Sequence, residues 1–179
     1  MLINPKDIVE RELGLAPGMK VADFGCGSGH FTTEIAKQIG RDGMVYAFDV
    51  QEEALSAVKS RASAMDIDNI ETARINLEIE KSTALTGGLV DLVIISNMLF
   101  QVENKEAVAR EAFRILKLGG KVIVIEWDVS SALAGPPRGV RINKKDTIDL
   151  FEGEKLEFAK EFPAGESHYG LIFSKNKHE

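Results

Sequence analysis

Cysteine, histidine and tryptophan are scarce in this sequence. Its 179 residues include one cysteine, three histidines and one tryptophan. One cysteine cannot form an internal disulfide, and the sequence shows no cluster of metal ligands, so we expect no metal site. The absence of an internal disulfide favours a reducing compartment, and we expect a cytoplasmic protein.

Long apolar runs and an excess of positive charge are also missing. No hydrophobic stretch is long enough to span a bilayer, and the N-terminal segment MLINPKDIVERELG lacks the basic and apolar blocks of a secretory signal. The 22 Lys and Arg residues are outnumbered by 28 Asp and Glu residues, which gives a net charge of −6. Generic nucleic-acid binding is therefore disfavoured, because it depends on positive charge.

Strand-like and helix-like segments alternate along the chain. Apolar residues recur at helical spacing in some segments and form short β-branched runs in others. This alternation predicts an α/β fold with a mostly parallel, doubly wound sheet and helices on both faces. The expected helices span residues 5–13, 28–39, 52–65 and 105–116, the last closed by Gly119 and Gly120. The expected strands span residues 20–24, 45–48, 70–75, 89–96, 121–127, 156–162 and 169–174.

The last two strands are joined by the short loop 163–168. That loop cannot hold a helical crossover, so we expect the two strands to pair antiparallel as a hairpin. With 44% hydrophobic and 28% charged residues, the composition is that of an ordinary globular protein, and we expect one domain over residues 1–179.

The most specific motif is VADFGCGSGH at residues 21–30. An apolar strand leads into Gly25, Gly27 and Gly29, at every second position, and a helix-like run follows. Glycines let the backbone bend sharply and approach a ligand, which the first amides of the following helix can bind. A G-x-G-x-x-G dinucleotide motif would need glycine where this chain has His30, and no P-loop string is present.

This motif resembles motif I of the class I S-adenosylmethionine (SAM) dependent methyltransferases, E/D-x-G-x-G-x-G, with Asp23 as its acid. The resemblance extends over about residues 18–175. It implies a Rossmann-like seven-stranded sheet of order 3-2-1-4-5-7-6, mostly parallel with a C-terminal antiparallel hairpin. It also implies SAM as the cofactor, with S-adenosylhomocysteine as its product, and a role for Asp23 in positioning the methionine moiety.

A second acid, Asp49, ends the run MVYAFD at the expected second strand. Ligands of such sheets bind beyond the carboxyl ends of the strands, where a carboxylate can accept hydrogen bonds from both ribose hydroxyls. The resemblance implies that role for Asp49 and contacts to adenine from Asn76 and Leu77. The full set of expected cofactor contacts is Asp23, Gly25, Cys26, Gly27, Gly29, His30, Asp49, Val50, Asn76, Leu77, Ser96 and Asn97.

Some of these residues also have structural alternatives. Asp23 could satisfy amides of the turn, and Asn76 could simply form a turn after its strand. Cys26 is expected to be a small apolar filler rather than a nucleophile. His30 faces either the carboxylate end of the cofactor or solvent.

The acceptor site is less clearly marked. Met98, Leu99 and Phe100 form either a hydrophobic wall for the acceptor or ordinary packing. In the irregular segment 129–142, Arg138 or Arg141 either pairs an acidic substrate group or lies in an exposed loop. His168 in the hairpin loop is the candidate general base. The sequence SNML at 96–99 lacks the Asn/Asp-Pro-Pro-aromatic motif of base-methylating enzymes, so that activity is disfavoured.

We therefore expect a SAM-dependent methyltransferase that acts on a small-molecule acceptor. The segment LKLGGKVIVIEW followed by GPPRGVRI loosely resembles the ubiquinone/menaquinone-biosynthesis-type group. We expect no inserted cap domain, so the acceptor cleft should be open unless a second copy of the chain, a partner subunit or a larger substrate closes it. A non-catalytic SAM-binding subunit or sensor is the alternative. An NAD(P)-dependent oxidoreductase is less favoured, because neither Tyr46 nor Tyr169 has a lysine four residues on.

Overall fold

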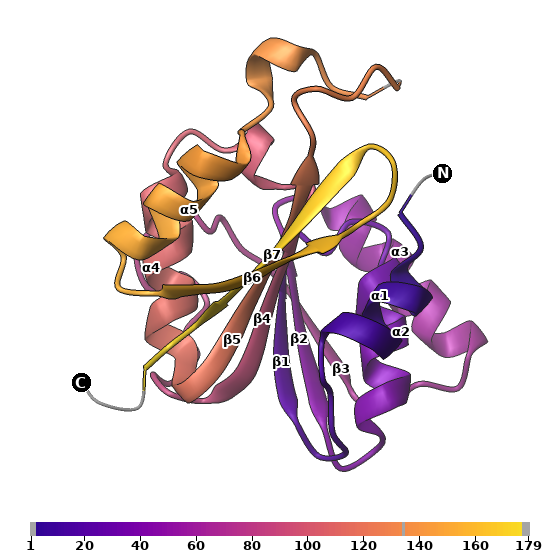
Figure 1. Ribbon diagram of the computed structural model, residues 1–179. Helices are drawn as coiled ribbons and strands as arrows, with labels where there is room; N and C mark the ends of the chain where they lie inside the picture. The colour runs from indigo at the N-terminus through magenta and orange to yellow at the C-terminus, as the bar shows by residue number, and fades with distance from the viewer. Residues whose placement is uncertain (1–2, 134, 177–179) are drawn as a thin grey trace.

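A computed structural model describes residues 3–133 and 135–176 of the chain. Residue 134 of the expected irregular segment 129–142, and residues 1–2 and 177–179 of the expected domain, lie outside the described residues. Seven strands form one sheet in the order β3-β2-β1-β4-β5-β7-β6, as expected (Figure 1). The strands are β1 (Lys20–Phe24), β2 (Met44–Asp49), β3 (Ile70–Arg74), β4 (Val90–Ser96), β5 (Leu116–Trp127), β6 (Glu157–Pro163) and β7 (His168–Ser174).

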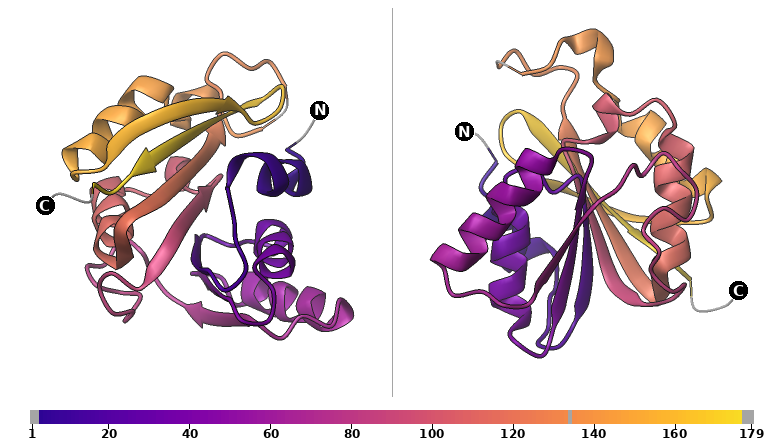
Figure 2. Two further views of the ribbon diagram at one scale, coloured as in Figure 1. Left: turned by 60° about the horizontal axis from the view of Figure 1, so that its bottom comes forward. Right: turned by 180° about the vertical axis from the view of Figure 1, so that it is seen from behind.

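Helices cover both faces of the sheet. Figure 2 shows α1, α2 and α3 on one face and α4 and α5 on the other. The helices are α1 (Pro5–Glu12), α2 (His30–Ile39), α3 (Glu52–Ala64), α4 (Lys105–Ile115) and α5 (Lys144–Gly153), with short 3-10 turns η1 (Leu99–Gln101) and η2 (Arg138–Val140). Within residues 3–133 and 135–176, no helix has the length and hydrophobicity needed to cross a membrane.

The central strand β4 is buried on both faces, which explains its nearly continuous apolar sequence. Leu92 and Ile94 pack into the core under α1 and α2. Val93 and Ile95 pack into the core under α4 and α5. The strands of the parallel part, β3-β2-β1-β4-β5, all end at the same edge of the sheet, and this edge carries the turns that follow β1, β2 and β4.

The hairpin is confirmed: β6 and β7 pair antiparallel, and β7 also pairs antiparallel with β5. Its boundaries differ slightly from those expected. His168 is the first residue of β7 rather than part of the loop, and it lies opposite Trp127 of β5.

Two expected boundaries are wrong for a tertiary reason. The glycines Gly119 and Gly120 do not close a helix, because α4 ends at Ile115 and β5 begins directly afterwards. The first residues of β5 bond to distant parts of the chain rather than to α4. Leu116 pairs with Val90 of β4, and the Gly119 amide donates to the carbonyl of Lys175 at 2.7 Å. Likewise, α2 starts at His30 rather than at residue 28, after Gly29 with φ of 79°.

Helix α5 is absent from the sequence expectation. It begins after Asn143, whose side chain accepts a hydrogen bond from the Asp146 amide at 2.9 Å, and it buries Thr147 and Phe151. The helix begins two residues after the expected irregular segment 129–142, in which Arg138 lies in η2.

Candidate functional site

A cleft of about 670 Å³ lies at the carboxyl edge of the parallel strands. Its lining residues come from the N-terminal segment, the turns after β1, β2, β3 and β4, and the ends of β5 and β7. From the expected set they include Asp23, Gly25, Cys26, Gly27, His30, Asp49, Val50, Asn76, Leu77, Ser96, Asn97, Met98 and His168. The volume is typical of sites for small molecules, which span roughly 300–1,000 Å³.

The glycine turn after β1 forms one wall of the cleft. Gly25, Gly27 and Gly29 have φ of 70°, 50° and 79°, in the left-handed region that favours glycine. A Cβ on Gly29 would lie 2.8 Å from Cγ2 of Val58, so this glycine allows α2 and α3 to pack closely. A Cβ on Gly27 would meet nothing within 4 Å, so the chain leaves this position free to approach a ligand. Gly29 does not line the cleft.

Asp49 joins the turns after β1 and β2. Its Oδ2 accepts a hydrogen bond from the Gly27 amide at 2.9 Å, and its Oδ1 accepts one from the Gln51 amide at 3.0 Å. An ionised carboxylate offers about four lone-pair positions, so each oxygen keeps room for one further donor. The side chain can therefore hold the turn and still receive two ligand hydroxyls.

Asp23 is buried below the turn, with 2% of its surface exposed. The Thr32 hydroxyl donates to its Oδ2 at 2.6 Å. Burial, together with the nearby charge of Asp49, outweighs this bond and raises the pKa of Asp23 to about 7. A cationic group in the cleft would favour its ionised form.

The neighbouring Cys26 is 8% exposed, and burial raises the pKa of its thiol well above the usual range. Such a thiol is not activated as a nucleophile, which agrees with its expected role as a filler. His30 is exposed at the start of α2, and its Nε2 lies 3.2 Å from Nη2 of Arg61.

The turn after β3 is hydrogen-bonded to the segment between η1 and α4. Asn76 Oδ1 accepts a hydrogen bond from the Glu78 amide at 2.9 Å, so its side chain does form a local turn. Glu78 Oε1 in turn accepts from the amides of Glu103 and Asn104, both at 2.7 Å. Leu77 is 3% exposed and belongs to the core beside the cleft.

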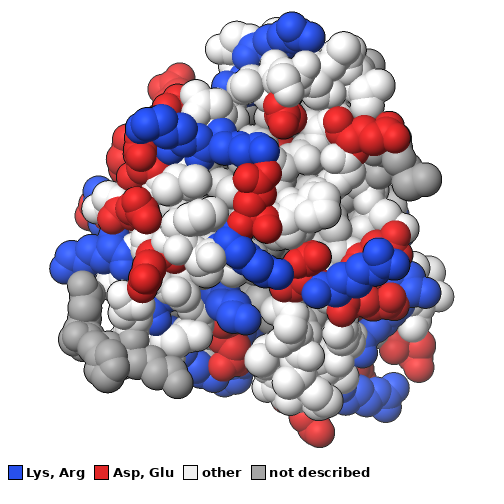
Figure 3. Space-filling model, in the orientation of Figure 1, with Lys and Arg blue, Asp and Glu red and all other residues white. Residues whose placement is uncertain are grey.

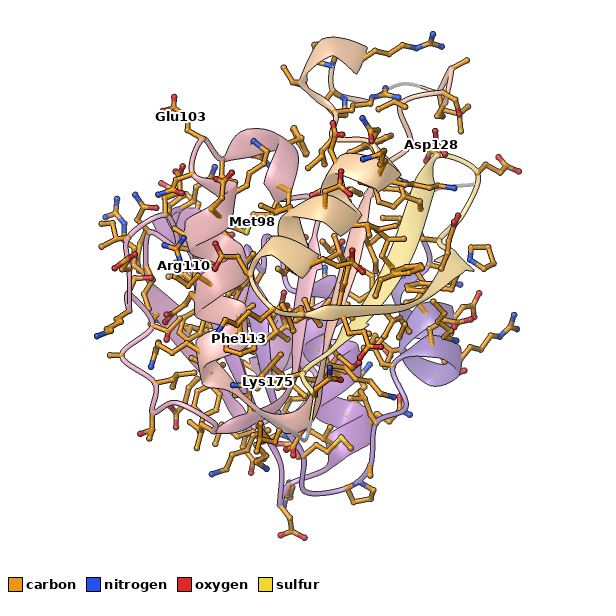
Figure 4. All side chains as sticks on the ribbon, turned by 60° about the vertical axis from the view of Figure 1, so that its left-hand side comes forward. Met98, Glu103, Arg110, Phe113, Asp128 and Lys175 are labelled. Atoms are coloured by element: carbon orange, nitrogen blue, oxygen red, sulfur yellow. The ribbon has the colours of Figure 1, made fainter. Side chains whose placement is uncertain are left out.

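Glu126, a residue the sequence did not single out, organises the turn after β4. It is fully buried near the end of β5, and its Oε1 accepts from the amides of Met98 at 2.8 Å and Leu99 at 2.6 Å. This bonding holds Asn97 with a φ of 54° and places Met98 against the glycine turn, where a Cβ on Gly25 would lie 3.0 Å from its Cγ. Figure 4 shows Met98 toward the same end of the sheet as Asp128, away from Phe113 and Lys175.

The other candidate acceptor contacts lie outside the cleft. Leu99 is fully buried in the core, and Phe100 does not line the cleft. Arg138 is exposed in η2, in the segment that projects above the sheet in Figure 1. Arg141 is occupied locally, because it donates to the carbonyls of Asp128, Ser131 and Pro136 and lies 5.4 Å from the ring centre of Trp127. Among the described residues, Arg141 therefore folds the loop onto Trp127 rather than facing the cleft.

The cleft is acidic. Asp23, Asp49 and Glu78 line it, whereas no lysine or arginine does so within the described part of the chain. Elsewhere, acidic and basic side chains are interspersed on the face shown in Figure 3. In residues 3–133 and 135–176, no group of three or more His, Cys, Asp or Glu side chains could hold a metal ion.

Comparison with known proteins decides the relationship. A family described as a methyltransferase domain matches residues 15–168. The chain belongs to the class I SAM-dependent methyltransferases. The family, the sheet order and the cofactor predicted from motif I are therefore confirmed, whereas the individual residue contacts stay predictions.

Two relatives of this methyltransferase domain act in quinone metabolism according to their names. A demethylmenaquinone methyltransferase of Bacillus mycoides (strain KBAB4) is 33% identical over 119 residues, covering 65% of this chain and 48% of the relative. The ubiquinone/menaquinone biosynthesis C-methyltransferase UbiE of Hydrogenovibrio crunogenus (strain DSM 25203 / XCL-2) is 33% identical over 116 residues, covering 64% and 44%. The chain thus spans less than half the length of these relatives.

A solved structure supports the fold over nearly the whole chain. The SAM-dependent methyltransferase from Aquifex aeolicus superimposes with a TM-score of 0.87 at 23% identity, covering 96% of this chain and 89% of that chain. Sequence reasoning missed some residues of the methyltransferase cleft, namely Ile3, Pro5, Phe31, Gln51, Glu78, Gln101 and Val102. Most lie one or two positions from an expected residue. Ile3 and Pro5 carry no sequence signal of a site, because only folding brings these two residues to this edge.

Proposed function

We propose that this chain binds SAM in the cleft and transfers its methyl group to a small-molecule acceptor. The observation that carries the proposal is the charge of the lining, three carboxylates without a lysine or arginine among the described residues. SAM carries a sulfonium and an ammonium group, which such a lining stabilises. A dinucleotide would bring a pyrophosphate, whose negative charge the carboxylates of this lining would repel.

The proposed contacts follow the geometry of the turns. Asp49 would accept hydrogen bonds from the ribose hydroxyls with its remaining lone pairs, and Val50 would pack beside the sugar. Asp23 would lie under the ammonium group. Asn76 and Leu77 would contact the adenine.

The sulfonium supplies an activated leaving group when SAM is bound, so the protein has little covalent chemistry to perform. Its residues hold the donor and the acceptor in line and exclude water. The turn held by Glu126 presents Asn97 and Met98 to the middle of the cleft, where they would keep the reacting groups in register. An obvious catalytic triad is not required for such a displacement.

The first experiment is calorimetric titration with SAM, S-adenosylhomocysteine and NAD. Binding of the first two and not of NAD is the expected result, and the reverse preference would overturn the proposal. A transfer assay with labelled SAM then covers quinols, phenols, carboxylates, proteins and RNA. Binding without transfer to any of these would favour the alternative, a SAM-binding subunit or sensor.

We also propose that a second copy of the chain or a partner subunit closes the acceptor end of the cleft, and that the protein works in the cytoplasm. The lone cysteine supports that compartment, because nothing in the chain calls for an oxidising environment. Light scattering of the SAM-bound protein measures the assembly state. A monomeric mass during turnover would refute self-assembly.

A further inference from the structure

The segment between β5 and α5 is anchored to the sheet at its two ends. At the first end, the Asp128 amide donates a hydrogen bond to the carbonyl of Ser167 at 2.9 Å. At the second end, the Tyr169 hydroxyl donates to the carbonyl of Ile142 at 2.9 Å. Both anchors lie at the start of β7, so they belong to one rigid part of the molecule. We refer to residues 129–141 between them as the strap, which projects above the sheet in Figure 1.

The strap is closed on itself. The hydrogen bonds of its described residues, 129–133 and 135–141, stay within the strap and Asp128. The Arg141 guanidinium group makes the central closure, because it donates to three backbone carbonyls of this segment at 2.8, 2.9 and 3.0 Å. A segment held in this way can move as one body about its anchored ends. Its larger apolar side chains are exposed rather than packed in the core, namely those of Val129, Leu133 and Val140.

The strap rests on the ring of Trp127. A Cβ on Gly135 would lie 2.5 Å from Cζ3 of this ring, so there is no room for a side chain between the strap and the ring. The backbone of Gly135 is outside the left-handed region, so the close contact, and not the backbone conformation, requires glycine here. Arg141 adds a second contact, with its Cζ 5.4 Å from the ring centre.

Trp127 also lines the cleft, whereas no described residue of the strap does so. The ring therefore lies between the cleft and the strap. Across the strands, Trp127 is paired with His168, and the centres of their two rings are 4.1 Å apart. The position of the Trp127 ring is thus set by β7 and by the strap together.

We propose that the strap holds Trp127 in place as the end wall of the cleft, and that this wall opens when the strap lifts from the ring as one body. Gly135 and Arg141 are then positioning residues, because they act on the cleft only through Trp127. With the strap lifted, the ring loses two of its neighbours and becomes free to change rotamer, which exposed side chains do within picoseconds to nanoseconds. This inference goes beyond the proposed function, because it concerns the opening of the cleft and holds for any ligand.

The fluorescence of Trp127 tests the inference directly, because the chain contains one tryptophan. Emission wavelength, quenching by acrylamide and anisotropy decay are measured for the wild type, Gly135→Gln, Arg141→Lys and Gly139→Gln. Gly139 is the matched control: it lies in the same strap and outside the left-handed region, and a Cβ there would meet nothing within 4 Å. Arg141→Lys keeps the charge but replaces the rigid fork of donors with one ammonium group.

Gly135→Gln should shift the emission to longer wavelength, raise the quenching constant and add a fast anisotropy decay, because the ring becomes exposed and free to rotate. An overpacked contact of this kind moves the equilibrium toward the lifted strap roughly 5- to 150-fold. Arg141→Lys should change in the same direction by less, because Gly135 still fits against the ring. Gly139→Gln should match the wild type.

Two results would overturn the inference. The same fluorescence in Gly135→Gln as in the wild type, or an equal change in Gly139→Gln, would show that the strap does not dock through Gly135. A shift of the emission without the fast anisotropy decay would show that the strap covers the ring but does not hold it as a wall.

Calorimetry with SAM and S-adenosylhomocysteine separates this inference from the proposed function. The strap contacts Trp127 and not Asp49, so the four proteins should bind these compounds with equal affinity. A wild type that binds neither compound refutes the proposed function, while the fluorescence comparison, which needs no ligand, still decides the role of the strap. Binding lost in Gly135→Gln alone would overturn the inference, because the strap would then act on the cofactor end of the cleft.

Discussion

The carboxylate of Asp49 and the amide of Gly27 are joined by a hydrogen bond of 2.9 Å. This bond connects the two features that the sequence marks most clearly, the glycine turn after β1 and the acid after β2. A carboxylate that already orients the turn needs no reorganisation to receive further donors. Preorganisation of this kind lowers the free-energy cost of binding a ligand.

Replacing Asp49 with alanine should therefore weaken SAM binding. Removal of a charge-assisted hydrogen-bond acceptor costs about 1–3 kcal/mol, which corresponds to a Kd raised roughly 5- to 150-fold. Calorimetric titration measures the change. Asp42→Ala, an exposed acid outside the cleft, is the control and should bind as the wild type does. An Asp49→Ala protein with unchanged affinity would remove this residue from the site.

Two glycines of the turn should respond differently to alanine. Both Gly27 and Gly29 have positive φ, so either substitution costs about 1–2 kcal/mol of backbone strain. Only at Gly29 does the new Cβ also meet Val58, at 2.8 Å, which adds about 1–3 kcal/mol of overpacking. Urea unfolding should show the larger loss of stability for Gly29→Ala.

Gly27→Ala should instead fold and lose SAM binding, because its methyl group enters the open space of the cleft. A titration at the same folded concentration tests this. Normal binding by Gly27→Ala would mean that the ligand does not approach the turn at this position.

The pKa of Asp23 predicts a pH dependence of SAM binding. Burial raises this pKa to about 7, and only the ionised carboxylate pairs with the ammonium group of SAM. The ionised fraction rises about fivefold between pH 6 and pH 7, where the ammonium group of SAM stays protonated, so the Kd should fall by about that factor over this range. Asp23→Asn should bind more weakly and show a flatter profile. A wild-type Kd that rises with pH would contradict the ammonium contact.

Sequence reasoning succeeded where a local pattern and the tertiary structure agree. The β-branched run of β4 and the short link between β6 and β7 contain enough information to place a buried central strand and a hairpin. Sequence reasoning failed where contacts between distant parts of the chain determine the secondary structure. The segment 116–120 contains two glycines and looks like a helix end, but pairing with β4 and the bond from Gly119 to Lys175 extend it into β5.

In the candidate site, too, residues marked by a local motif could be predicted, whereas residues that act through distant contacts could not. The glycine turn and Asp49 could be located because the motif they match has particular residues at particular spacings. Glu126 could not, because one glutamate in an apolar strand carries no signal of the turn that it supports 28 residues earlier. For Arg141 the sequence left open a substrate contact and an exposed loop. It could not show that backbone carbonyls of its own loop satisfy the guanidinium group.

Glu126 itself gives a prediction about stability. Burial raises its pKa from 4.5 to about 7, so the folded protein keeps a proton that the unfolded chain releases. Its contribution to stability is fully present below pH 4.5 and is lost as the pH rises through about 7, where a buried charge must be tolerated. The loss should amount to about 1–3 kcal/mol.

Glu126→Gln keeps an oxygen that can accept from the amides of Met98 and Leu99 but carries no charge at any pH. The comparison is between urea unfolding at pH 5 and at pH 8. The wild type should lose about 1–3 kcal/mol more than Glu126→Gln does, and the variant should be the more stable of the two at pH 8. Because Asp23 is intact in both proteins, its own titration cancels from the difference. An equal pH dependence of the two proteins would show that Glu126 is already ionised in the folded state, and that the turn after β4 is held by a buried carboxylate rather than by a carboxylic acid.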